Sequence, residues 1–244
     1  AASDVYKRQH KINAGELITL DNKNKDFFFF EKKDVRSVMG ALVYLVKTRL
    51  PEYIGASPFE IQVLTPMRKG ELGVEHLNEV LQYYLNPASE SKKEKEGRTG
   101  VFREGDKVMQ VKNNYKLEWK ITNAKGFSIE EGLGVFNGDM GIIKQINTYS
   151  ERITVVFDEN REAEYPFSSL DELELAYAIT IHKSQGSEYP AVVLPLLSGP
   201  PILCNRNLLY TAITRAQKCV AIAGRQSMVA VSYTHLRAHE TGAY

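Results

Sequence analysis

Apolar residues in the first part of the chain alternate between short continuous runs and helical spacing. The continuous runs predict strands at Phe27–Phe30 and Ile61–Leu64. Apolar residues at helical spacing predict a helix that follows Asp34 as its N-cap and stops at Pro51. The same spacing predicts a second helix over Gly73–Tyr84. Strands that alternate with helices in this way indicate parallel strands joined by crossover helices.

The middle of the chain has a different pattern. Residues 88–100 are rich in Ser, Lys, Glu and Gly and predict a flexible link. Short β-rich runs separated by turn residues follow, at Val108–Val111, Gly141–Ile146 and Arg152–Phe157. No amphipathic helix is predicted between residues 102 and 167. These features predict a small all-β insert, a compact barrel.

The alternation of strands and helices resumes after the insert. Its predicted elements are a strand at Leu173–Ile179, a turn or short helix at His182–Gly186, a strand at Ala191–Leu196, a helix at Asn205–Ala216 and a strand at Cys219–Ala223. The predicted fold class is therefore α/β, a parallel sheet flanked by helices with a small all-β barrel inserted.

Composition narrows the functional classes only a little. The 244 residues carry 31 Lys plus Arg against 30 Asp plus Glu, so any nucleic-acid site must be a local patch. The two cysteines, Cys204 and Cys219, form no metal or disulfide framework and fit a reducing, cytoplasmic compartment. No apolar run reaches the roughly 18 residues of a membrane helix, so no membrane partner is expected.

The two ends of the chain look foreign to the rest. Ala1–Gln9 and Val231–Tyr244 resemble translated adapter or vector sequence, and the alternative is a native polar tail. We leave both ends out of the fold prediction. His235 and His239 are accordingly not interpreted as metal ligands, and no metal site is predicted.

One apolar run ends in Asp158-Glu159, which has the form of the Mg²⁺-holding strand of a P-loop NTPase. That interpretation needs a Gly-x-x-x-x-Gly-Lys-Ser/Thr loop to cradle the phosphates, and the sequence has none. Asn160 follows as a turn residue, so we predict a hairpin turn at Asp158–Asn160.

Three stretches carry residues suited to anion chemistry. Arg68 and Lys69 follow a predicted strand, and arginine offers a planar fork for phosphate oxygens, although a solvated basic turn explains them too. Thr180–Glu188 lies between two apolar runs and offers hydroxyls and backbone N–H groups, as a simple helix cap also would. Thr211 and Arg215 lie one helical turn apart, where Arg215 also complements the helix macrodipole.

Taken together and in this order, these stretches resemble the second RecA-like motor domain of superfamily 1 DNA helicases, in the RecD-like branch. His182–Glu188 resembles motif V, Tyr210–Arg215 motif VI and Thr65–Arg68 motif IV. Gly105–Gln110 and Phe136–Asp139 resemble the SH3-like insert of RecD-like enzymes. The resemblance extends from about residue 10 to about residue 229.

The resemblance implies a RecA-like parallel sheet flanked by helices, with an SH3-like barrel inserted. Residues 10–99 form the first part of the motor domain, 100–168 the insert and 169–230 the second part. Residues 1–9 and 231–244 remain the suspected non-native ends.

An ATP-dependent 5′–3′ DNA helicase of the RecD-like branch is the implied function. Arg215 is the implied arginine finger and Arg68 the motif IV arginine, both catalytic at the γ-phosphate. The other implied site residues are Glu188, Gly186 and Gln185 for the nucleotide, with Glu188 on the ribose, and Thr180, His182, Lys183, Ser184 and Thr65 for single-stranded DNA. We predict that Arg68, Glu188 and Arg215 meet at one edge of the sheet.

ATP with Mg²⁺ is the implied cofactor pair. The Mg²⁺ ligands belong to a first RecA-like domain that the sequence does not contain, so the chain alone is expected not to hydrolyse ATP. Expected partners are single-stranded DNA, ATP, that first domain and subunits of a recombination and repair complex. The alternatives are the helicase portion of a conjugative relaxase and a non-catalytic nucleic-acid- or protein-binding module built around the insert.

Overall fold

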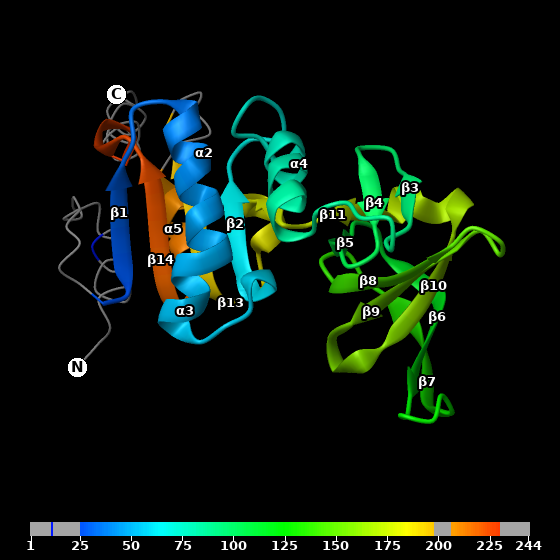
Figure 1. Cartoon of the computed structure of the whole chain (residues 1–244). Helices are drawn as coiled ribbons and strands as arrows, with labels where there is room; N and C mark the ends of the chain where they lie inside the picture. Colours follow the sequence, from blue (N-terminus) through cyan, green and yellow to red (C-terminus); the bar gives the residue numbers. More distant parts are fainter. Residues whose placement is uncertain (1–10, 12–24, 198–205, 230–244) are drawn as a thin grey trace, which may run out of the picture. The chain divides into compact units, whose positions relative to one another are not determined.

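The computed structural model describes residue 11, residues 25–197 and residues 206–229 (Figure 1). The chain divides into two compact units. The first comprises residues 1–77 and 178–244, and the second comprises Asn78–Tyr177. The chain therefore leaves the first unit once and returns to it once.

The first unit is built on a five-stranded sheet whose paired strands are all parallel. Its order is β1-β14-β13-β2-β12. The strands are β1 (Phe27–Glu31), β2 (Ile61–Thr65), β12 (Ala178–Thr180), β13 (Tyr189–Leu196) and β14 (Ala216–Gly224). The predicted parallel α/β fold is confirmed.

Helices cover both faces of this sheet. α2 (Val35–Tyr44) and α3 (Leu50–Ile54) lie in front of it in Figure 1, and α5 (Arg206–Thr214) lies behind. α4 (Val74–Leu85) follows β2 and carries the chain from the first unit into the second. The helices α4 and α5 fall within one or two residues of their predicted positions.

The helical segment after β1 begins as predicted but ends later. Asp34 caps α2, because the Ser37 backbone N–H donates to its Oδ1 over 2.8 Å. The predicted stop at Pro51 is wrong. A π-helical stretch, Leu45–Arg49, shifts the hydrogen-bond register so that Pro51 falls in the first turn of α3, where its missing N–H costs no helical bond. The segment ends at Gly55, whose φ of 67° is left-handed.

The second unit is an antiparallel sheet in the order β11-β5-β8-β9-β10-β6-β7. Its strands are β5 (Lys107–Gln110), β6 (Asn114–Thr122), β7 (Ser128–Val135), β8 (Met140–Asn147), β9 (Arg152–Phe157), β10 (Glu162–Pro166) and β11 (Leu173–Leu175). The all-β insert is confirmed, and its three predicted strands correspond to β5, β8 and β9. The other long strands, β6 and β7, are largely exposed, so no apolar run announces them.

The Asp-Glu sequence after β9 forms a turn, as predicted. Glu159 and Asn160 both have left-handed φ values, 61° and 60°. The turn joins β9 to its antiparallel neighbour β10. No Mg²⁺-holding strand of a nucleotide-binding sheet is formed by these described residues.

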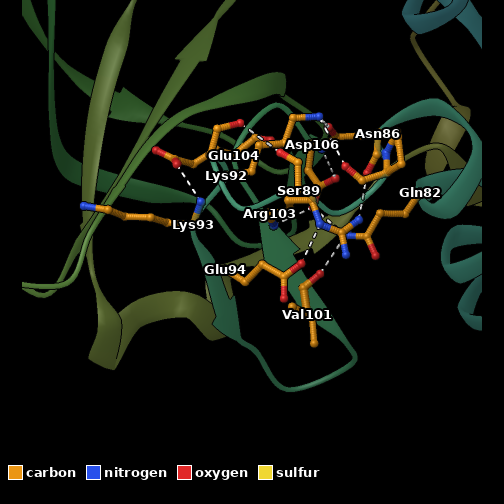
Figure 2. A network of polar contacts seen from close by, with 12 residues as sticks. Gln82, Asn86, Ser89, Lys92, Lys93, Glu94, Val101, Arg103, Glu104 and Asp106 are labelled. Atoms are coloured by element: carbon orange, nitrogen blue, oxygen red, sulfur yellow. Dashed lines mark hydrogen bonds and ion pairs between the residues drawn. The ribbon is translucent and has the colours of Figure 1, made fainter.

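The predicted flexible link at residues 88–100 is wrong in its second half. β3 (Glu94–Glu96) pairs antiparallel with β4 (Val101–Arg103). Arg103 Nε donates to Glu94 Oε1 over 2.6 Å, and the Lys93 backbone N–H donates to Glu104 Oε1 over 2.7 Å (Figure 2). The charged residues that suggested a solvated linker instead hold a hairpin together.

The single predicted strand at Leu173–Ile179 is two strands in two different sheets. β11 pairs antiparallel with β5 in the second unit, and β12 pairs parallel with β2 in the first. Ala176 and Tyr177 lie between them and are buried. Because the whole run is largely apolar and buried, hydropathy alone does not show where the chain changes sheets.

Asp106 is a buried polar centre of the second unit (Figure 2). Its carboxylate accepts hydrogen bonds from Gln82 Nε2 of α4 at 2.6 Å and from Asn86 Nδ2, just after α4, at 2.8 Å. The Arg103 backbone N–H at 2.6 Å and the Tyr177 hydroxyl at 2.8 Å donate to it as well. Burial raises the pKa of Asp106, and these hydrogen bonds oppose that rise. The network joins α4, the turn before β5 and the residues after β11.

Gly224 is expected to tolerate no side chain. A Cβ added there would lie 2.0 Å from the Leu196 carbonyl oxygen, a backbone atom that cannot move aside. Gly224→Ala should therefore lower the free energy of unfolding by about 2 kcal/mol or more, measured by urea denaturation. Gly40 in α2 is the control, because an added Cβ meets no neighbouring atom within 4 Å and alanine favours the helix by about 1 kcal/mol. Equal effects of the two changes would contradict this expectation.

Candidate nucleotide and DNA site

Two threonines end neighbouring strands of the parallel sheet. Thr65 of β2 pairs with Thr180 of β12. Thr65 is fully buried and its hydroxyl donates to the Leu72 carbonyl over 2.8 Å. Thr180 caps the 3-10 turn that follows it, because the Lys183 backbone N–H donates to its Oγ1 over 3.4 Å. Both hydroxyls therefore shape the turns at the carboxyl edge of the sheet.

The turn after Thr180 divides its side chains between core and solvent. His182 and Gln185 are exposed, and Lys183 is half-buried. Gly186 is exposed and has a left-handed φ of 82°, which explains a glycine at this place. Ser184 is buried, and its hydroxyl donates to the Ile181 carbonyl over 2.6 Å.

These positions correct part of the predicted DNA set. Thr65 and Ser184 are fully buried and their hydroxyls have partners inside the protein, so neither touches a DNA strand in this conformation. His182, Lys183 and Gln185 reach the surface of the turn. Thr180 holds the turn that presents them.

Arg215 follows α5 and lies immediately before β14. Its Nη1 donates to the Ser187 carbonyl over 3.3 Å and its Nη2 to the Thr214 hydroxyl over 3.4 Å. The Arg215 Nε is buried and has no hydrogen-bond partner among the described residues. A buried, positively charged donor without a partner is uncommon in a finished protein core, and an anionic ligand would satisfy it.

Further contacts join the end of the turn to the residues around Arg215. The Tyr189 backbone N–H donates to the Arg215 carbonyl over 2.8 Å. Gln217 Nε2 donates to Glu188 Oε2 over 3.2 Å. The Tyr189 hydroxyl is buried and, within the described part of the chain, has no hydrogen-bond partner. Segments 187–189 and 215–217 therefore form one connected site at the start of β13 and β14. Sequence reasoning did not single out Tyr189 or Gln217.

The prediction that Arg68, Glu188 and Arg215 meet at one edge is wrong. Arg68 is exposed and follows the carboxyl end of β2, whereas Glu188 and Arg215 precede the first residues of β13 and β14. Ala191 of β13 pairs with Ile61, the first residue of β2, so these positions lie beyond opposite ends of β2. A five-residue strand spans about 13 Å. The segment between Thr180 and Tyr189 runs from one edge of the sheet to the other. Its polar sequence gives no sign of this crossing, so Glu188 was predicted at the wrong edge.

Metal and membrane features give no second site. Among the described residues, no group of three or more His, Cys, Asp or Glu side chains is placed to hold a metal ion. No helix in the same residues is both long and apolar enough to cross a membrane.

Comparison with known protein families matches two parts of the chain. Residues 77–157 match the SH3 domain of ATP-dependent RecD-like DNA helicases. Residues 175–223 match the UvrD-like helicase C-terminal domain. The chain contains the C-terminal region of a RecD-like helicase. In this RecD-like region, the SH3 match falls almost wholly in the second unit, and the second match spans the site from Thr180 to Gln217.

Curated relatives extend well beyond the RecD-like region described here. The ATP-dependent RecD2 DNA helicase of Deinococcus radiodurans is 39% identical over 170 residues, which are 70% of this chain and 21% of that protein. The RecBCD enzyme subunit RecD of Mycolicibacterium smegmatis is 29% identical over 183 residues, 75% of this chain and 28% of that protein. The chain thus spans less than a third of the length of either relative.

A solved structure supports the fold of the RecD-like region. The crystal structure of Pif1 helicase from Bacteroides in complex with ADP-AlF3 and single-stranded DNA has a TM-score of 0.50 and 17% sequence identity. The match covers 100% of this chain and 55% of the Pif1 chain.

Proposed function

We propose that this RecD-like region is the second motor domain of an ATP-dependent 5′–3′ DNA helicase, with Arg215 as its arginine finger. The observation that carries the proposal is the Arg215 guanidinium, which is held on Ser187 and Thr214 while its Nε lacks a partner among the described residues. A charge fixed in this way is prepared to stabilise the phosphoryl group during transfer. The relative from Deinococcus radiodurans, an ATP-dependent DNA helicase by name, supports the same reaction.

In this proposal ATP lies between the region and a first RecA-like domain that supplies the phosphate loop and the Mg²⁺ ligands. Mg²⁺ would neutralise phosphate charge there. On this side of the cleft Arg215 meets the γ-phosphate, and Glu188 accepts a hydrogen bond from the ribose. Gln185 and Gly186 lie on the turn that leads to Glu188. Arg68 lies past the far end of β2, so we assign the finger role to Arg215 alone.

Single-stranded DNA is the proposed second ligand, bound by the surface of the turn after Thr180. His182 and Lys183 supply donors to the phosphate backbone, and Thr180 holds their turn in place. The same turn ends at Ser187, which accepts the hydrogen bond from Arg215. A movement of Arg215 on closure of the ATP cleft would therefore pull directly on the DNA-binding turn.

Lys183→Ala in the full-length helicase tests the DNA part of the proposal. The variant should bind single-stranded oligothymidylate about threefold to tenfold more weakly, because one phosphate contact is lost. The slope of log Kd against log salt concentration should fall by about 0.7 for the same reason. Fluorescence anisotropy over a series of salt concentrations measures both. Lys33→Ala is the control, because Lys33 is exposed beside the opposite edge strand, β1. An unchanged salt slope for Lys183→Ala would remove it from the DNA site.

ATP turnover tests the nucleotide part. Loss of DNA-stimulated turnover on replacing Arg215 supports a motor, whereas unchanged turnover together with intact DNA binding would favour the non-catalytic binding module.

A further inference from the structure

The strands β13 and β14 begin with an irregularity in their pairing. Tyr189 pairs with Ala216, but Ala191 pairs with Cys219. One residue of β13, Pro190, therefore lies opposite two residues of β14, Gln217 and Lys218. This leaves one extra residue on the β14 side. Such β-bulges re-aim a side chain and are common beside active sites.

Gln217 lies in this irregular stretch, and its side chain reaches Glu188. The Gln217 Nε2 donates to Glu188 Oε2 over 3.2 Å, although both residues are exposed and neither needs the other to satisfy a buried group. The second carboxylate oxygen, Oε1, has no partner among the described residues. Glu188 therefore presents one fixed oxygen and one open acceptor.

The backbone around this pair is held on both sides. The residue before Glu188, Ser187, accepts the hydrogen bond from Arg215 Nη1. The residue after it, Tyr189, donates its backbone N–H to the Arg215 carbonyl. The backbone on both sides of Glu188 is therefore anchored to Arg215, which suits a ligand with a hydroxyl at one end and an anion at the other.

We propose that Gln217 is a positioning residue that fixes the Glu188 carboxylate to accept a hydrogen bond from one ribose hydroxyl, so that the site prefers nucleotides that carry this hydroxyl to those that lack it. The inference rests on the proposed nucleotide site. An amide suits this role better than a lysine would, because it orients the carboxylate without neutralising its charge and leaves Oε1 a strong acceptor.

The test uses the full-length helicase and the variant Gln217→Ala. We expect the KM for ATP and the Kd for ADP to rise about fivefold while kcat stays within about twofold, because only a ground-state contact weakens. Steady-state kinetics measure KM and kcat, and calorimetry measures the Kd for ADP. Calorimetry with 2′-deoxy-ADP and 3′-deoxy-ADP should show no effect of the variant on whichever analogue lacks the contacted hydroxyl.

Two further variants sharpen the comparison. Gln217→Glu keeps the size of the side chain, removes the donor and repels Glu188, so the Kd for ADP should rise more than in Gln217→Ala. Gln226→Ala is the matched control, because Gln226 is an exposed glutamine beyond the other end of β14. Its Kd for ADP should equal that of the unmodified protein.

The outcomes separate this inference from the proposed function. If Glu188→Ala weakens ADP binding and Gln217→Ala does not, the positioning role is overturned and the nucleotide site stands. If Gln217→Ala weakens all three nucleotides equally, its effect does not pass through a ribose hydroxyl and the inference is again overturned. If Glu188→Ala and Gln217→Ala both leave ADP binding unchanged, the inference and the nucleotide role of Glu188 fail together.

Discussion

Replacing Arg215 with alanine in the full-length helicase is expected to lower DNA-stimulated ATP turnover about 10³-fold, the usual scale of an arginine finger. The loss should be large because no other guanidinium among the described residues lies at the start of β13 and β14 to replace that of Arg215. The Kd for single-stranded DNA without nucleotide should change less than about threefold, since the DNA-facing side chains of the turn remain. Turnover with saturating oligothymidylate and anisotropy without nucleotide measure the two quantities.

Two controls make the Arg215 result specific. Arg215→Lys keeps the positive charge but loses the planar fork, so it should recover only a small part of the lost turnover. Arg225→Ala removes an exposed arginine beyond the far end of β14, whose Nη2 donates to the Lys33 carbonyl over 2.7 Å, and should leave turnover unchanged. Normal turnover in a folded Arg215→Ala protein would rule out the finger role.

Most elements of the parallel sheet could be predicted, because local physics dominates them. The aromatic run at β1, the apolar run at β2 and the Asp34 cap each act within a few residues. Pro51 shows the limit of such local rules. Proline is disfavoured inside a helix. The π-helical stretch just before it shifts the hydrogen-bond register, so that Pro51 lies in the first turn of α3. The preferences of single residues do not predict such a shift.

Only some residues of the candidate site were predictable, and its geometry was not. The chemistry of Thr180–Glu188 and Arg215 is visible in the sequence, but which sheet edge each residue reaches depends on strand register. Glu188 stands before β13 at the amino edge because eight residues after Thr180 cross the length of the sheet. The role of Gln217 was even less predictable, since it contacts Glu188 from an irregular stretch between two strands that are far apart in sequence.

Buried polar residues explain why part of the second unit escaped prediction. Asp106 lies in a charged sequence, yet it is fully buried and accepts four hydrogen bonds. Its partners Gln82, Asn86 and Tyr177 are distant in sequence. Polar and charged side chains that suggested solvent exposure are thus buried, and only the folded structure shows which of them form hydrogen bonds with one another.

Asp106→Asn is expected to lower the free energy of unfolding of the second unit by about 3 kcal/mol. All four partners of Asp106 donate to it, so the new amide nitrogen would face donors and leave at least one of them without an acceptor. Trp119 is the only tryptophan in the chain and lies on β6 of this unit, so its fluorescence during urea denaturation reports on the second unit directly. Asp158→Asn, at an exposed carboxylate in the turn after β9, should change the midpoint little.

The pH dependence provides a second test of the same carboxylate. Because burial raises the pKa of Asp106 above the ordinary 3.8, the folded protein binds this proton more tightly than the unfolded chain does. The contribution of Asp106 to stability is therefore greatest below its unfolded pKa and declines as pH rises through its folded pKa. Asp106→Asn cannot titrate, so the stability difference between the unmodified protein and the variant should shrink as pH rises through that window. A difference that grows with pH would mean that the four hydrogen bonds outweigh burial and hold the pKa of Asp106 below its ordinary value.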